Sequence, residues 1–149
     1  MQFQTDNYKV LIIDFGSQVT KLIARRIREL GVYSEIITPK KLNKIKDYNN
    51  IKGLIFSGGP SSVTASKFET VQKKIFKKKI PILGICYGLQ LIAKLLGGKI
   101  NPSKKRREFG RALLFKKKSS LLTKNYLNKK KVVWMSHEDA VVKLPKNFK

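Results

Sequence analysis

The 149-residue sequence predicts an α/β fold: an open, mostly parallel, twisted sheet with helices on both faces. Short runs rich in β-branched residues alternate with helical patterns along the chain, which is typical of a parallel sheet covered by helices. A hydrophobic fraction of 42% is enough for a buried core, and the length suits one domain. We therefore expect a single domain over residues 1–149, without an internal repeat, a linker or a second domain.

The first part of the chain predicts three strands and one helix. Strands are expected over residues 9–14, 33–37 and 51–57, because each run is rich in apolar and β-branched residues. Between the first two, apolar residues recur at spacings of four, four and three on one face of an amphipathic helix: Val19, Ile23, Ile27 and Leu30. Gly31 is expected to end this helix, and Pro39 to break the second strand.

The rest of the chain predicts two helices and three strands. A helix is expected from about Phe68 to Lys78, followed by a strand over residues 80–85. The next helix, residues 89–96, is apolar on nearly every side and is closed by a Gly-Gly pair. Two further strands are expected near residues 111–115 and over residues 131–135, and the last one is expected to extend the parallel sheet.

The pentapeptide Gly84–Gly88 places the single cysteine, Cys86, between two glycines directly after an apolar strand. This is the pattern of a nucleophile elbow, a sharp strand-to-helix turn in which the glycines avoid collisions. A helix beginning at Tyr87 would direct unpaired N–H groups and the positive end of its dipole at the sulfur, which favours the thiolate. Cys86 is therefore predicted to be a nucleophile, and a buried structural cysteine is the alternative.

Two other segments follow predicted strands: residues 57–60 (SGGP) and residues 136–139 (SHED). Ligands collect at the carboxyl ends of the strands in an open parallel sheet, so we expect both segments to lie near Cys86. A Gly-Gly turn lets a backbone N–H approach a substrate closely, which makes the N–H groups of Gly59 and Tyr87 candidates for an oxyanion hole. A plain tight turn is the alternative for the glycine pair.

His137 is the only histidine of the chain. It follows directly on a predicted strand, and three roles are open for it. It can line a ligand pocket, it can be an ordinary surface histidine, or it can be the base that activates Cys86.

The chain carries 33 Lys and Arg against 9 Asp and Glu, a formal net charge of +24. Such a charge suits a polyanionic partner, but the cations occur in separate short runs. We interpret these runs as solvated surface produced by compositional drift, with specific nucleic-acid recognition disfavoured. A basic nucleic-acid-binding module remains the alternative from another functional class, and it would gather Lys, Arg and aromatic residues on one face.

A single cysteine excludes an internal disulfide, which suits a reducing compartment. No apolar run approaches the roughly 20 residues that cross a bilayer, and the first residues are neither basic nor apolar. A cytoplasmic protein without a membrane partner is therefore expected.

Taken together, the motifs resemble the class I, triad-type glutamine amidotransferases over nearly the whole chain, from Val10 to about Phe148. Each motif is weak alone, but their order and spacing are specific. The opening turn at Asp14–Gln18 favours the branch of this class that aminates XMP, and the amidotransferases of anthranilate, aminobenzoate or CTP synthesis remain alternatives. The segments that carry the resemblance are VLIIDFGSQ (10–18), ARRIRELGVY (24–33), SGGP (57–60), GICYGLQ (84–90), REFG (107–110) and VWMSH (133–137).

The resemblance implies that Cys86 attacks the side-chain amide of glutamine, while the N–H groups of Gly59 and Tyr87 hold the oxyanion. The ammonia would pass to a synthetase half, in the same or a separate chain, that uses ATP and Mg²⁺ to aminate XMP. The complete enzyme would be a homodimer, and no cofactor or metal is expected in its amidotransferase portion. The resemblance also implies glutamine-binding roles for Gln90, Ser136 and His137.

The sequence departs from the family in two places. Glu138 stands where the family commonly has Gly, and its charge would lie near the substrate carboxylate. The catalytic histidine and glutamate of the family lie in a later Gly-Val-Gln-Phe-His-Pro-Glu segment, which has no counterpart in these residues. We therefore expect the front part of an amidotransferase domain, whether a fragment, a shortened gene product or a subunit completed by another chain. Negligible glutaminase turnover is expected from it alone.

Overall fold

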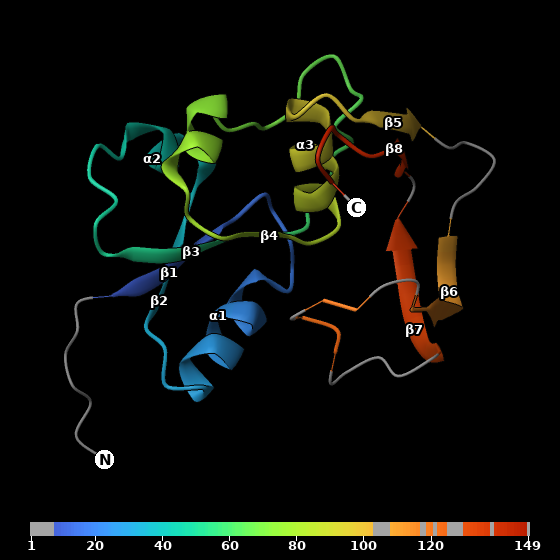
Figure 1. Cartoon of the computed structure of the whole chain (residues 1–149), viewed down its shortest axis with the longest axis horizontal. Coiled ribbons are helices and arrows are strands. Elements are labelled where there is room, and N and C mark those ends of the chain that lie inside the picture. Colours follow the sequence, from blue (N-terminus) through green and yellow to red (C-terminus); the bar gives the residue numbers. More distant parts are fainter. Residues whose placement is uncertain are drawn as a thin grey trace. The chain divides into compact units, whose positions relative to one another are not determined.

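The computed structural model describes residues 8–102, 108–116, 119–120, 122–124, 130–137 and 139–148. They fall into two compact units, each described by itself (Figure 1). We call the first, Met1–Pro102 with Asp139–Lys149, the sheet unit. The second, Ser103–Glu138, we call the ribbon unit. Among the described residues, no helix has both the length and the apolar character that a membrane span requires.

The sheet unit is built on four parallel strands in the order β2-β1-β3-β4. The carboxyl ends of all four strands therefore meet at one edge, which is where the functional segments were expected. The predicted parallel α/β fold is confirmed, and the strand limits differ from the expected ones by no more than two residues. The strands are β1 (Lys9–Ile13), β2 (Ser34–Ile37), β3 (Ile51–Phe56) and β4 (Ile82–Gly84).

Helices cover both faces of this sheet. Helix α1 (Thr20–Glu29) lies on one side of the strands, and α2 (Pro39–Lys44) and α3 (Tyr87–Leu95) lie on the other (Figure 1). A short 3₁₀ helix, η1 (Lys73–Lys78), precedes β4. As predicted, α1 ends at a glycine: Gly31 follows it with a φ of 78°, in the left-handed region that glycine adopts without strain.

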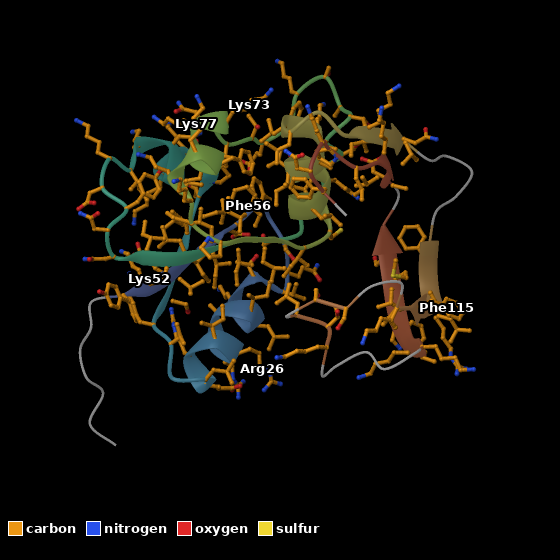
Figure 2. The ribbon with its side chains drawn as sticks, in the orientation of Figure 1. Arg26, Lys52, Phe56, Lys73, Lys77 and Phe115 are labelled. Atoms are coloured by element: carbon orange, nitrogen blue, oxygen red, sulfur yellow. The ribbon has the colours of Figure 1, made fainter. Side chains whose placement is uncertain are left out.

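Strand β1 shows why both faces of the parallel sheet must be covered by helices. Leu11 and Ile13 belong to the main apolar core, while Ile12 points to the opposite face because side chains alternate along a strand. Ile12 is nevertheless fully buried, and so is Ala24 of α1. Phe56 of β3 lies inside the sheet unit, whereas the labelled cations Arg26, Lys52, Lys73 and Lys77 point outward (Figure 2).

Two helical segments differ from the expectation. Pro39 does not merely break the strand but occupies the first turn of α2, where a missing N–H costs nothing. Thr38 caps this helix, since its hydroxyl accepts from the N–H of Lys41 at 3.2 Å. The helix expected from Phe68 to Lys78 is reduced to η1. Gln72 before it has an extended backbone, with φ −71° and ψ 136°, and its N–H donates to the side chain of Asn43 at 2.8 Å.

The remaining strands form two antiparallel pairs. In the sheet unit, β5 (Lys99–Pro102) pairs with β8 (Asp139–Lys143), and in the ribbon unit β6 (Glu108–Phe115) pairs with β7 (Lys130–His137). The expectation that residues 131–135 extend the parallel sheet is therefore wrong. Apolar, β-branched composition predicts that a strand forms but does not specify its partner or direction, because sheet propensity reflects packing context.

Candidate active site

Cys86 lies in the strand-to-helix turn that the sequence predicts. Strand β4 ends at Gly84, α3 begins at Tyr87, and Cys86 between them has φ 51° and ψ −111°. A positive φ is rare for a residue with a side chain, and such strain concentrates at functional sites. The side chain is exposed and forms no disulfide, which does not fit the buried structural alternative.

The two glycines of the elbow are required by close backbone contacts. A Cβ atom on Gly84 would lie 2.7 Å from the backbone nitrogen of Leu89. A Cβ atom on Gly88 would lie 2.2 Å from the carbonyl oxygen of Phe56 in β3. Because both distances are far below van der Waals contact, α3 can only pack this closely with glycine at both positions.

Hydrogen bonds fix the elbow against the end of β3. The N–H of Ile85 donates to the carbonyl of Phe56 at 2.9 Å, and the N–H of Gly88 donates to the carbonyl of Ser57 at 3.0 Å. The N–H of Gln90 donates to the carbonyl of Cys86 at 3.1 Å, which makes Cys86 the first acceptor of α3. The strained turn is thus held from both sides by neighbouring backbone.

The Gly-Gly turn after β3 lies beside Cys86. A Cβ atom on Gly58 would be 3.6 Å from the Cβ of Cys86 and 3.5 Å from the Oγ of Ser17. A Cβ atom on Gly59 would collide with the carbonyl oxygen of Phe15 at 2.4 Å. This turn was predicted to approach Cys86. Of its two glycines, Gly59 is required by close approach, whereas a Cβ on Gly58 would make ordinary van der Waals contacts. Ser17 also lies here, a neighbour that the sequence did not single out.

The N–H groups of Gly59 and Tyr87 were the predicted oxyanion donors. Within the described residues, neither of them donates to a backbone carbonyl. Both belong to segments that border Cys86, one in the turn after β3 and one at the first position of α3. Their role as oxyanion donors, which acyl transfer would require, remains a prediction.

Ser57 holds this edge of the sheet together. Its side chain is completely buried, accepts from the N–H of Phe15 at 3.2 Å and donates to the carbonyl of Gly58 at 2.9 Å. Its own N–H donates to the carbonyl of Ile13 at 3.0 Å. Ser57 thereby joins the ends of β1 and β3 below the Gly-Gly turn. The only sequence signal for this role is a polar residue closing an apolar strand.

Tyr87 anchors the start of α3 with its side chain. The ring is 1% exposed, its centroid lies 5.1 Å from that of Phe15, and its hydroxyl donates to the carbonyl of Glu69 at 2.5 Å. Burial, with a smaller contribution from the negative charge of Glu69, raises the pKa of Tyr87 to about 12. The buried side chain fixes the orientation of the backbone N–H at the elbow.

Gln90, predicted to bind substrate, faces the interior of the sheet unit. Its side chain is nearly buried, and its Nε2 donates to the carbonyl of Asp139 in β8 at 2.8 Å. The Asp139 carboxylate accepts in turn from the hydroxyl of Ser62. Gln90 thus links α3 to β8, and Asp139 links β8 to the loop after the Gly-Gly turn.

Ser136 and His137 lie in β7 of the ribbon unit, opposite Phe109 and Glu108 of β6. Because β7 is not a strand of the parallel sheet, the argument that placed them at its carboxyl edge is wrong. Glu138 lies outside the described residues. Among the described residues there is no group of His, Cys, Asp and Glu side chains that could hold a metal ion.

Residues 11–149 match the family described as glutamine amidotransferase class-I, and the chain belongs to this family. The chain is 50% identical over 144 residues to the GMP synthase [glutamine-hydrolyzing] of Borrelia garinii subsp. bavariensis, and it is also 50% identical over 142 residues to that of Aquifex aeolicus. These alignments cover 94% and 93% of the chain but only 26% and 27% of the relatives, so the chain spans about a quarter of their length.

A solved structure supports the same relationship. The putative GMP synthase subunit from Thermoplasma acidophilum superposes with a TM-score of 0.77 at 28% identity. The match covers 95% of this chain and 70% of that one. The open parallel sheet with helices on both faces is therefore the fold of a class-I glutamine amidotransferase.

Proposed function

We propose that this chain is the glutamine-hydrolysing portion of a GMP synthase. The observation that carries the proposal is the exposed, positive-φ Cys86 in an elbow whose flanking glycines are enforced by backbone contacts. Family membership and the similarity to named GMP synthases support the choice of glutamine as substrate. The products are glutamate and ammonia.

The chemistry assigned to the elbow is covalent. The Sγ of Cys86 attacks the side-chain amide carbon of glutamine, and the carbonyl oxygen becomes an oxyanion held by the N–H groups of Gly59 and Tyr87. The carbon–nitrogen bond then breaks, ammonia leaves, and water hydrolyses the thioester to glutamate. Loss of one such donor costs about a hundredfold or more in rate.

By similarity to the family, Gln90, Ser136 and His137 bind the α-amino and carboxylate groups of glutamine. Ammonia passes to a synthetase half that binds ATP and Mg²⁺ and aminates XMP to GMP. The complete enzyme is a homodimer that works in the cytoplasm. These assignments extend the similarity to the longer relatives, of which this chain spans about a quarter.

The acid–base partner of Cys86 has no counterpart among the 149 residues. His137 is the only histidine, and by similarity it corresponds to the glutamine-binding loop of the family and not to the catalytic position. General acid–base catalysis contributes about 10²–10⁴-fold, so this chain alone turns glutamine over at a negligible rate.

The decisive experiment uses a glutamine analogue with a diazoketone in place of the side-chain amide, which alkylates a nucleophile in a glutamine site. We expect one adduct on Cys86 by mass spectrometry, protection by glutamine but not by asparagine, and no adduct with Cys86→Ala. Chloroacetamide is the control reagent, because it alkylates any exposed thiol. Labelling no faster than by chloroacetamide, without protection by glutamine, would contradict the proposed function. Steady-state glutaminase turnover that Cys86→Ala abolishes would contradict the proposed need for a further acid–base pair.

A further inference from the structure

The β6–β7 ribbon presents one face that neither the elbow nor the sheet unit explains. In its antiparallel register, Phe109 lies opposite Ser136, and Arg111 lies opposite Trp134. Farther along, two more pairs follow on the same face: Leu113 with Val132, and Phe115 with Lys130. Alternate residues of a strand share a face, so these four pairs form one continuous surface, which we call the aromatic face of the ribbon.

The apolar side chains of this face are exposed to a degree that is unusual for their size. Trp134 is 81% exposed, Phe115 is 62% exposed and Phe109 is 61% exposed. Leu113 and Val132 between them are also exposed. Figure 2 shows Phe115 at one end of the ribbon. Contiguous exposed apolar surface marks a binding site more often than a structural feature.

Cationic side chains lie around and between these aromatic rings. Arg111 and Lys130 are exposed and stand directly across from Trp134 and Phe115. The sequence of the ribbon unit, residues 103–138, contains twelve Lys and Arg against two acidic residues. The dispersed lysine runs in the sequence did not predict a basic aromatic surface. The aromatic and cationic side chains of this face become neighbours only through the pairing of β6 with β7.

Aromatic rings alternating with cations on a flat strand surface suit one class of ligand. Nucleobases stack on exposed rings, and Lys and Arg contact the phosphates between them. Side chains two residues apart on a strand are separated by about 6.7 Å, a distance that successive nucleotides of an extended single strand can span. In a duplex the bases are already stacked and paired, so the rings would have no partner.

We propose that the aromatic face of the ribbon binds single-stranded nucleic acid without sequence preference. Bases stack on Phe109, Trp134 and Phe115, and phosphates contact Arg111 and Lys130. The excess of cations favours a polyanion over a protein partner, whose surface would have to be strongly acidic around an apolar centre. The stacking rings and the two cations include no group of the elbow.

The experiment uses the fact that Trp134 is the only tryptophan of the chain, so selectively excited tryptophan emission reports on this face. The probes are a 12-nucleotide oligo(U) and a 12-nucleotide oligo(dT), added to the 149-residue chain near physiological salt. We expect both to quench Trp134 emission, with an affinity that falls as salt rises. The oligonucleotide that binds more tightly shows whether RNA or DNA is preferred, since only RNA offers a 2′-hydroxyl.

Variants separate stacking from general charge attraction. Labelled oligonucleotide anisotropy should show Trp134→Ala binding about fivefold to a hundredfold more weakly, and Trp134→Phe should restore most of the loss. The matched control is Lys73→Ala with Lys77→Ala, which removes two exposed cations of η1 in the sheet unit and should change affinity less than twofold.

Three results would overturn the proposal: no quenching of Trp134 emission by either oligonucleotide, equal losses in the tryptophan and lysine variants, or duplex binding as tight as single-strand binding. Unchanged melting temperatures establish that each variant is folded.

Discussion

The sheet unit and the ribbon unit use the same residue types in opposite ways. In β1 of the sheet unit, Leu11, Ile12 and Ile13 are at most 1% exposed. In β6 of the ribbon unit, Leu113 is 55% and Phe115 is 62% exposed. Burial of a large apolar side chain contributes about 1.5–3 kcal/mol to stability. The first group therefore stabilises the fold, whereas the second remains available for contacts with another molecule.

Packing requires two glycines of the sheet unit, whereas the glycine of the ribbon unit has open space around it. Gly59 and Gly88 of the sheet unit are required by collisions that a Cβ atom would make with backbone. Gly110 of the ribbon unit has nothing within 4 Å of a Cβ position, and only its φ of 106° calls for glycine. Close packing thus restricts Gly59 and Gly88 to glycine, whereas Gly110, like Gly31 and Gly97 of the sheet unit, is favoured by its positive φ alone.

The largest expected effect comes from forcing a side chain into the closest contact of the sheet unit. In Gly88→Ala the new Cβ would lie 2.2 Å from the carbonyl oxygen of Phe56, so α3 must move away from β3. We expect a loss of about 3 kcal/mol or more in the free energy of unfolding, because overpacking against backbone cannot relax by a rotamer change. Urea unfolding followed by far-UV circular dichroism measures it.

Gly53→Ala is the matched control for this variant. Gly53 lies in β3, and a Cβ there would be 3.6 Å from the nearest atom, a side-chain carbon of Val10. Its stability should be unchanged or higher by up to about 1 kcal/mol, since alanine is favoured over glycine in a strand interior. Equal losses in the two variants would show that α3 is not packed on β3 as described.

An intermediate effect is expected from the buried phenol of Tyr87. Its pKa is raised to about 12 by burial, whereas an unfolded tyrosine ionises near pH 10. The folded state therefore keeps its proton longer than the unfolded state. The stability contributed by the protonated phenol of Tyr87 is fully present below about pH 10 and is lost as pH rises toward about 12. The total loss in the free energy of unfolding is roughly 2 kcal/mol. Tyr87→Phe lacks this pH-dependent loss.

The comparison of wild type and Tyr87→Phe isolates this group, because all lysines and other tyrosines titrate in both. Near pH 8 the variant should be less stable by about 1 kcal/mol, since the carbonyl of Glu69 loses its donor. Near pH 12 the difference should shrink or reverse. Parallel pH curves for the two proteins would mean that the phenol is not buried.

Much of the sheet unit could be predicted from sequence because its signals are local. Apolar runs identified β1 to β4, and the Gly-x-Cys-x-Gly spacing identified the elbow, since the collisions that require those glycines arise wherever this turn forms. Helix α2 was missed because Pro39 is compatible both with a broken strand and with the first turn of a helix.

The rest of the candidate site depends on contacts between distant segments. The bond of Gln90 to the carbonyl of Asp139 spans 49 positions, and that of Phe15 to the side chain of Ser57 spans 42. No local pattern specifies such pairs. For the same reason strands were predicted near residues 111–115 and over residues 131–135, but their pairing with each other as β6 and β7 was not.

The smallest expected effect is that of Leu113→Ala in the ribbon unit. Compared with Leu91→Ala, the same chemical change in the sheet unit, it is the most direct test of the comparison. Leu91→Ala removes a fully buried side chain of α3 and should cost about 2–5 kcal/mol through lost burial and a cavity. Leu113→Ala removes an exposed side chain that faces Val132 across the ribbon, and it should cost no more than about 0.5 kcal/mol. Urea unfolding measures both. A loss at Leu113 approaching that at Leu91 would mean that the aromatic face is buried in solution, for example between two copies of the chain. A dependence of the loss on protein concentration would then identify that contact.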